Sequence, residues 1–273
     1  MSASCSPSEI ARKTMSLIIL TLAVIGPAPS AHGEIPWWKQ EKIRFMWGKW
    51  TLFRLAENVD GHSCKLPREI FRNIAQAGGT VFAELSGYQP SNARIVHELG
   101  MYYFATTFLD VAGMPGGRRW VMANGEEHAS SEQFKCPLDE SSYEKWIVEP
   151  HLQGVRDGLI DGIHFDWEGY GGRGEGGICY CDYCFSTFPD FKMSGATLPR
   201  KSERHRWLTK RNLMENYEEN RSRRRVAMFT RLREKLQAAN PHLLFSSYNM
   251  LVSDFSEAMH TPEAPFIVLD ARH

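Results

Sequence analysis

Three ionisable residues alternate with apolar ones near the middle of the chain, where residues 161–168 run Asp-Gly-Ile-His-Phe-Asp-Trp-Glu. Side chains alternate between the two faces of a strand, so a strand here would place His164, Asp166 and Glu168 together on one face. Asp166 and Glu168 would then lie about 6–7 Å apart at Cβ, where ionising one carboxyl group raises the pKa of the other. A carboxyl group held protonated near neutral pH can act as a general acid, and cleavage of a glycosidic bond needs such an acid.

Glu168 is therefore the candidate general acid, and Asp166 would orient it or act on the substrate directly. A structural interpretation competes with this one, in which both carboxylates cap a loop or form ion pairs at a strand end. Polar residues that face the interior of a barrel are costly unless they are paired, which favours the functional interpretation. Three residues at or near predicted strand ends join His164 as candidate substrate-binding residues: Tyr170, Tyr248 and Asn249.

The cysteines suggest a second site. Cys179, Cys181 and Cys184 form a Cys-x-Cys-x-x-Cys group that is too closely spaced for three independent disulfides. With Cys136 as the fourth ligand, the group suits a tetrahedral zinc ion, and four thiolates would leave no open position for substrate. The zinc would therefore be structural, and no catalytic cofactor is expected. Two disulfides among the same residues are the alternative, because an exported protein meets an oxidising compartment.

The segments that must position these residues alternate between strand and helix patterns, which is typical of βα units around a mainly parallel sheet. Strands are predicted within residues 43–55, 80–85, 101–108, 159–168, 243–248 and 266–269. Helices are predicted over residues 67–77, 93–99, 143–156 and 204–239, with Pro150 expected to kink or restart the third. Residues 110–136 and 169–199 are predicted to be long irregular insertions. The expected fold is an α/β barrel of the (β/α)₈ type, incomplete at about six βα units and truncated at its C-terminus.

The N-terminus and the overall charge narrow the class of protein. Residues 1–33 have the form of a secretory signal, with Arg12 and Lys13 before a short apolar run and a small-residue site at Ala31-His32-Gly33. The run is too short to span a bilayer, and an uncleaved anchor is the alternative. Residues 34–273 are expected to form one secreted or periplasmic domain without membrane contact.

The balance of 32 Lys and Arg against 32 Asp and Glu argues against a nucleic-acid partner.

Within residues 136–188, a strand-end glutamate is followed by Gly-Tyr-Gly, then by Cys-Tyr-Cys-Asp-Tyr-Cys and Phe188. This arrangement resembles the family 42 β-galactosidases and related uncharacterised glycosidase-like families. The resemblance implies a barrel whose general acid/base glutamate, here Glu168, ends the fourth strand, and a zinc-binding cysteine cluster after it. It also implies an oligosaccharide or polysaccharide substrate. Trp167 stands where those enzymes have Asn, and the nucleophilic glutamate of their seventh strand has no match in this sequence.

A second, shorter pattern overlaps the first. Asp161, His164, Asp166 and Glu168 resemble the Asp-x-x-Asp-x-Asp-x-Glu motif of family 18 chitinases, with His164 in place of the middle Asp. This resemblance implies that Glu168 is the acid and that Asp166 holds the acetamido group of the substrate, which itself attacks.

Two functional hypotheses follow from these patterns. In the first, the protein is a secreted glycoside hydrolase-like enzyme that cleaves O-glycosidic bonds with Glu168 as general acid/base. In the second, it is a non-catalytic carbohydrate-binding protein or an inactive truncated barrel, because strands beyond the sixth are missing from the pattern.

Overall fold

The computed structural model describes residues 37–40, 43–47, 57–60, 63–84, 87–108, 116–128, 135–166, 178–248, 253–262 and 264–269. The chain divides into two compact units, Met1–Gln40 and Glu41–His273, and the described part of the first is helix α1 (Trp37–Gln40). All other described elements belong to the second unit. None of the helices in these ranges is long and apolar enough to cross a lipid bilayer.

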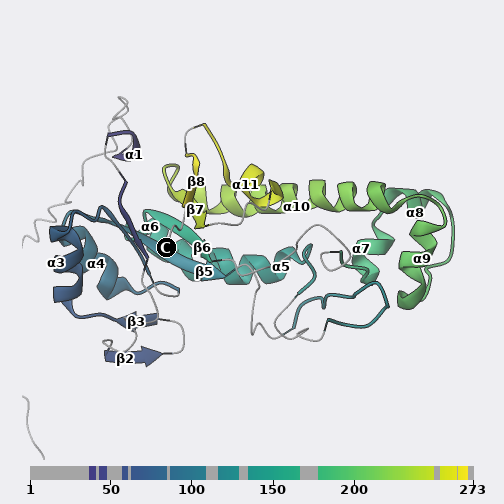
Figure 1. The fold of residues 1–273 in the computed structure, drawn as a ribbon, viewed down its shortest axis with the longest axis horizontal. Helices are drawn as coiled ribbons and strands as arrows, with labels where there is room; N and C mark the ends of the chain where they lie inside the picture. The colour runs from purple at the N-terminus through teal and green to yellow at the C-terminus, as the bar shows by residue number, and fades with distance from the viewer. Residues whose placement is uncertain are drawn as a thin grey trace, which may run out of the picture. The chain divides into compact units, whose positions relative to one another are not determined.

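Among the described residues, six parallel strands form the main sheet of the second unit (Figure 1). Their spatial order follows their order in the chain: β1 (Phe45–Trp47), β4 (Val81–Ala83), β5 (Tyr102–Phe108), β6 (Gly162–Asp166), β7 (Leu244–Tyr248) and β8 (Phe266–Leu269). Each strand pairs in parallel with the next one. Such an order is that of a (β/α) barrel wall, whereas a doubly wound sheet reverses its order at a switch point. The predicted fold class is confirmed, and β6 is the fourth strand.

Helices occupy the crossovers between these strands (Figure 1). The short crossovers contain α3 (Arg68–Gln76), α4 (Pro90–Glu98) and α11 (Ser253–Met259). The β5–β6 crossover contains α5 (Glu140–Tyr143), the π-helical turn η1 (Glu144–Val148) and α6 (Glu149–Arg156). The β6–β7 crossover contains α7 (Asp182–Ser186), α8 (Pro189–Met193), the 3₁₀ turn η3 (Lys201–Glu203), α9 (Arg204–Thr209) and α10 (Met214–Gln237). An antiparallel hairpin of β2 (Glu57–Asp60) and β3 (Ser63–Lys65) precedes α3.

The two faces of the sheet have different neighbours. Phe82 of β4 packs edge-on against Phe71 of α3, with ring centroids 5.0 Å apart, and Phe165 of β6 belongs to the same buried core. On the other face, the ring of Phe45 in β1 lies 5.2 Å from that of His164 in β6, although β4 and β5 separate these two strands. Contact across two intervening strands requires the sheet to curl. His164 therefore lies inside a partial barrel, and Phe165 lies under the helices, as strand alternation predicts.

The helices differ from the sequence prediction in several places. The helix expected at 93–99 begins at Pro90, because proline suits the first turn of a helix. The predicted restart at Pro150 is confirmed: α6 carries this proline in its first turn, directly after η1. The helical region predicted over 204–239 is confirmed but divided, since a turn in which Asn212 has a φ of 54° separates α9 from α10. The insertion predicted to be irregular contains the two short helices α7 and α8.

Asp161 ties the amino end of β6 to helix α4. Its Oδ2 lies 2.7 Å from Nε2 of His97 and accepts a hydrogen bond of 2.8 Å from the backbone N–H of Tyr103. The hydrogen bond that His97 donates to the carboxylate of Asp161 raises the pKa of His97, while partial burial opposes the shift. Asp161 therefore has a structural role at the end of β6 opposite to Asp166.

We expect Asp161→Asn to lower the free energy of unfolding by about 1–2 kcal/mol at pH 5.5 and by less at pH 9. The charged pair stabilises the fold fully below the ordinary histidine pKa of about 6.5, and this contribution is lost as the pH rises through the raised native pKa. Urea denaturation at the two pH values measures the difference. The Glu257→Gln variant, at an exposed position of α11, serves as the control without pH dependence, and an equal loss at both pH values for Asp161→Asn would contradict the pairing.

Candidate functional site

The carboxyl edge of the sheet carries the predicted catalytic strand. Asp166 is the last residue of β6 and pairs in register with Phe108 of β5, and Tyr248 is the last residue of the neighbouring β7. Both strands are parallel, so both residues stand at the same edge. The structure describes only the backbone of Asp166 and Tyr248. Three other predicted site residues lie outside the described residues: Glu168, Tyr170 and Asn249.

His164 lies one level deeper, in the interior of the curled sheet. It is fully buried and shares a register row with Thr106 of β5 and Ser246 of β7, which are also buried. Its Nδ1 lies 3.0 Å from the hydroxyl oxygen of Ser246. Burial lowers the pKa of His164 to about 3, so its imidazole is neutral near pH 7. His164 thus forms part of the polar interior beneath the strand ends, without adding a charge there.

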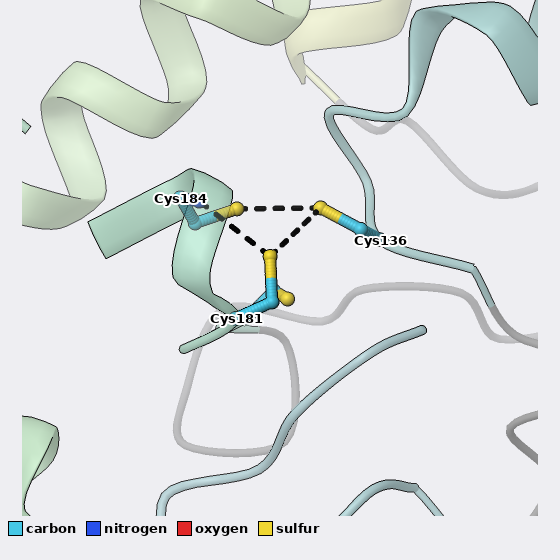
Figure 2. Close-up of side chains that lie close together, drawn as sticks. Cys136, Cys181 and Cys184 are labelled. Atoms are coloured by element: carbon cyan, nitrogen blue, oxygen red, sulfur yellow. Dashed lines mark hydrogen bonds between the residues drawn. The ribbon is translucent and has the colours of Figure 1, made fainter. Parts of the chain in front are cut away.

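The four predicted ligand cysteines come together in one buried cluster. The Sγ atoms of Cys136, Cys179, Cys181 and Cys184 all lie within 4.8 Å of one another. The Sγ of Cys136 is 3.3 Å from that of Cys184 and 3.6 Å from that of Cys181 (Figure 2). A disulfide has an S–S bond of about 2.05 Å, so the four residues are free thiols here rather than the disulfides of the alternative interpretation.

The cluster has the dimensions that a tetrahedral metal ion requires. Sulfurs that lie about 2.3 Å from a central zinc are separated from one another by about 3.8 Å, close to the observed spacing. All four cysteines are buried, so the group is closed to solvent. The cluster is therefore compatible with a structural zinc site.

The protonation of the thiols supports this fit. Hydrogen bonds between Cys181 and the neighbouring Cys136, Cys179 and Cys184 lower the pKa of Cys181. Hydrogen bonds to neighbouring sulfurs, together with burial, raise the pKa values of Cys136 and Cys184. Four thiolates in the same buried space repel one another and need a cation that offsets their repulsion.

Cys136 is positioned by the start of the α5 helix. Its N–H donates to the carbonyl of Arg118 at 2.7 Å, and its own carbonyl accepts from the N–H of Asp139 at 2.9 Å. The carboxylate of Asp139 is buried and accepts from the N–H of Arg118 at 2.6 Å and from the hydroxyl of Ser142 at 2.8 Å. These bonds form a closed ring around Cys136, and all of them are independent of a metal.

The other three cysteines follow directly after residues 167–177. Two hydrogen bonds join their segment to the preceding connection: the N–H of Tyr180 donates to the carbonyl of Val121 at 2.8 Å, and the indole N–H of Trp120 donates to the carbonyl of Ile178 at 3.1 Å. The hydroxyl of Tyr217 in α10 donates to the carbonyl of Cys179 at 2.7 Å. The segment that carries Cys179, Cys181 and Cys184 is thus held on both sides, by the β5–β6 crossover and by α10.

The turn between the last two ligands is a helix start. Cys181 is the N-cap of α7, and its Sγ accepts a hydrogen bond of 3.5 Å from the N–H of Cys184. A sulfur that takes the place of the usual N-cap oxygen satisfies one of the free N–H groups of the first turn. The Cys-x-x-Cys sequence therefore starts α7, and it brings the Sγ atoms of Cys181 and Cys184 into the same cluster.

One residue that supports the cluster was absent from the sequence prediction. Arg204 of α9 is buried and contacts the segment that carries Cys179, Cys181 and Cys184. It nevertheless belongs to a polar part of the sequence in which Lys201 and Arg206 are exposed. Composition and spacing carry no signal that distinguishes one arginine of such a stretch as buried. Only the geometry reveals it.

No known protein-family model and no curated protein sequence matches this chain. Among solved structures, a β-galactosidase from the psychrophilic Marinomonas ef1 is similar in fold, with a TM-score of 0.50 and 8% sequence identity. The similarity covers 76% of this chain and 38% of the β-galactosidase, so the chain spans well under half of that enzyme. A cold-adapted β-galactosidase from Rahnella sp. R3 matches with a TM-score of 0.43 and 15% identity, over 69% of this chain and 35% of the enzyme. The partial barrel is thus of the kind found in a β-galactosidase.

Proposed function

We propose that this protein is a secreted glycoside hydrolase-like enzyme that cleaves O-glycosidic bonds, with Glu168 as general acid/base. The observation that carries the proposal is the position of β6, the fourth strand of a parallel sheet in chain order, with Glu168 two residues beyond its carboxyl end. Chemistry in a barrel takes place at that edge. The likeness in fold to a β-galactosidase supports the same placement and makes β-galactosides the first substrates to test.

The chemistry assigned to each residue follows from its place at the edge. Glu168 donates a proton to the glycosidic oxygen as the bond to the sugar breaks, and the oxygen of a water molecule ends up bonded to the anomeric carbon as that water loses a proton. Asp166 orients Glu168 or acts on the substrate directly. His164 is neutral near pH 7, so it adds no positive charge that would lower the pKa of a nearby carboxyl group. In this proposal the charge of Asp166 raises the pKa of Glu168. In this proposal the substrate is held by Tyr170, Tyr248 and Asn249, whereas His164, also a candidate from the sequence, is fully buried and lies beneath the strand ends.

The buried cysteines are proposed to bind one structural zinc ion, through Cys136, Cys179, Cys181 and Cys184. Zinc would supply the positive charge that permits four adjacent thiolates, and it would take no part in the reaction because all four positions are filled by sulfur. It would bind the segment after residues 167–177 to the loop before α5. The stretch that contains Glu168 would then have β6 at one end and the metal cluster at the other.

We expect Glu168→Gln to reduce turnover of aryl β-galactosides and of released oligosaccharides by about 10²–10⁴-fold, since an amide cannot donate the proton. Glu149→Gln, on the exposed surface of α6, is the matched control with unchanged turnover. Circular dichroism of both variants checks that they fold. Wild-type turnover by Glu168→Gln would overturn the assignment, and glycan binding without turnover by the wild type would favour the carbohydrate-binding alternative.

We expect purified protein to contain about one zinc per chain by elemental mass spectrometry. Changing Cys136 or Cys184 to Ser should abolish stoichiometric zinc, because one ligand of a closed four-thiolate site is lost. Thiol titration of denatured protein provides the second measurement. A metal-free wild type whose four cysteines are blocked as disulfides would contradict the zinc site.

Export is the third part of the proposal, and the mature N-terminus tests it. We expect the protein recovered outside the cytoplasm to begin at Glu34, because the small-residue site ends at Gly33. N-terminal sequencing by mass spectrometry gives the answer. Intact residues 1–33 on the recovered protein would favour the uncleaved anchor instead.

A further inference from the structure

Arg204 in α9 is a buried arginine that binds three points of one insertion. Its side chain is 3% exposed. Nη1 donates to the carbonyl of Tyr180 at 2.7 Å, Nη2 donates to Oδ1 of Asp182 at 2.5 Å, and Nε donates to the carbonyl of Pro199 at 3.1 Å. Burial of a charged group without partners is strongly unfavourable, so these contacts are required for Arg204 to lie where it does.

Two of the three contacts bracket a cysteine. Tyr180 lies between Cys179 and Cys181, and Asp182 is the first residue of α7, directly after Cys181. A single planar guanidinium thus fixes the backbone on one side of Cys181 and the side chain on the other. The fork geometry of arginine permits this, because its donors point in fixed directions within one plane.

The third contact closes the insertion. The carbonyl of Pro199 lies after α8, so Arg204 joins the end of the insertion to its ligand-bearing start. The guanidinium carbon also lies 5.6 Å from the ring centroid of Phe185, the residue after Cys184. Together these contacts hold the segment of Cys179, Cys181 and Cys184 in shape by protein groups alone.

We propose that Arg204 is a positioning residue for the metal site, which keeps the three ligands of the α7 segment in the geometry that zinc requires. The proposal rests on the zinc site described above. Arg204 contacts carbonyl and carboxylate oxygens of the segment, so it acts through the shape of the ligand loop. Residues that hold metal ligands in this way change metal affinity by about 10–100-fold when they are replaced.

The test compares zinc release from full-length holoprotein variants to a chromophoric zinc chelator in excess. Arg204→Met and Arg204→Lys should both release zinc at least about tenfold faster than the wild type, because neither side chain can bind the three acceptors at once. Arg206→Met should release zinc at the wild-type rate, since Arg206 is exposed on the same helix. Val96→Ala, in the buried face of α4, controls for a general loss of stability and should also retain zinc.

The rates of zinc release from the variants decide whether Arg204 positions the ligands. Wild-type zinc release by Arg204→Met, or by Arg204→Lys, overturns the positioning role, and zinc release from Val96→Ala as fast as from Arg204→Met does the same. If Arg204→Met fails to fold, Arg204→Lys alone decides. A wild type that holds no zinc refutes the metal site itself and the role of Arg204 with it, whereas a zinc-containing wild type with an unaffected Arg204→Met refutes the role alone.

Discussion

Four buried sulfurs hold together the two connections that flank β6. Cys136 belongs to the connection before β6 and the other three cysteines to the connection after it, so the cluster bridges chain segments that the sheet alone would leave apart. The helices of these connections that carry or adjoin the cluster, α5, α7 and α8, are four or five residues long. Helices this short are marginal without tertiary support. Their arrangement therefore depends on the cluster and on the hydrogen bonds that surround it.

The sheet imposes a different kind of constraint on its carboxyl edge, where the proposed site lies. Because the sheet curls, the inward row of Thr106, His164 and Ser246 is enclosed, and Phe45 of the first strand covers His164. This polar layer is hydrogen-bonded and carries no charge near pH 7, which makes it tolerable inside a barrel. The residues that could contact a sugar must then lie above it, at and beyond the ends of β6 and β7.

Much of the fold could be predicted from the sequence, since strands and long helices repeat with simple periods. The six strand positions and the inward direction of His164 follow from alternation, and the cysteine cluster follows from the Cys-x-Cys-x-x-Cys spacing. The strands of the β2–β3 hairpin, Glu-Asn-Val-Asp and Ser-Cys-Lys, are short and mostly polar. They therefore lack the alternation of apolar and polar residues that predicts a strand. The break at Asn212 and the burial of Arg204 depend on tertiary contacts. Glu168 remains a sequence prediction, as it lies outside the described residues.

The position of Arg204 along the chain has a consequence for how the molecule assembles. Cys136 and Cys184 are 48 residues apart, and Arg204 follows Asp182 by 22 residues, so both the cluster and its support are long-range contacts. Closing such loops costs chain entropy before any contact compensates for it, which slows the step that forms them. The strands up to β6 precede Cys179, Cys181 and Cys184 in the chain, whereas Arg204 follows these cysteines in α9. Metal capture at the proposed zinc site would then follow the closure of this loop and come late in folding.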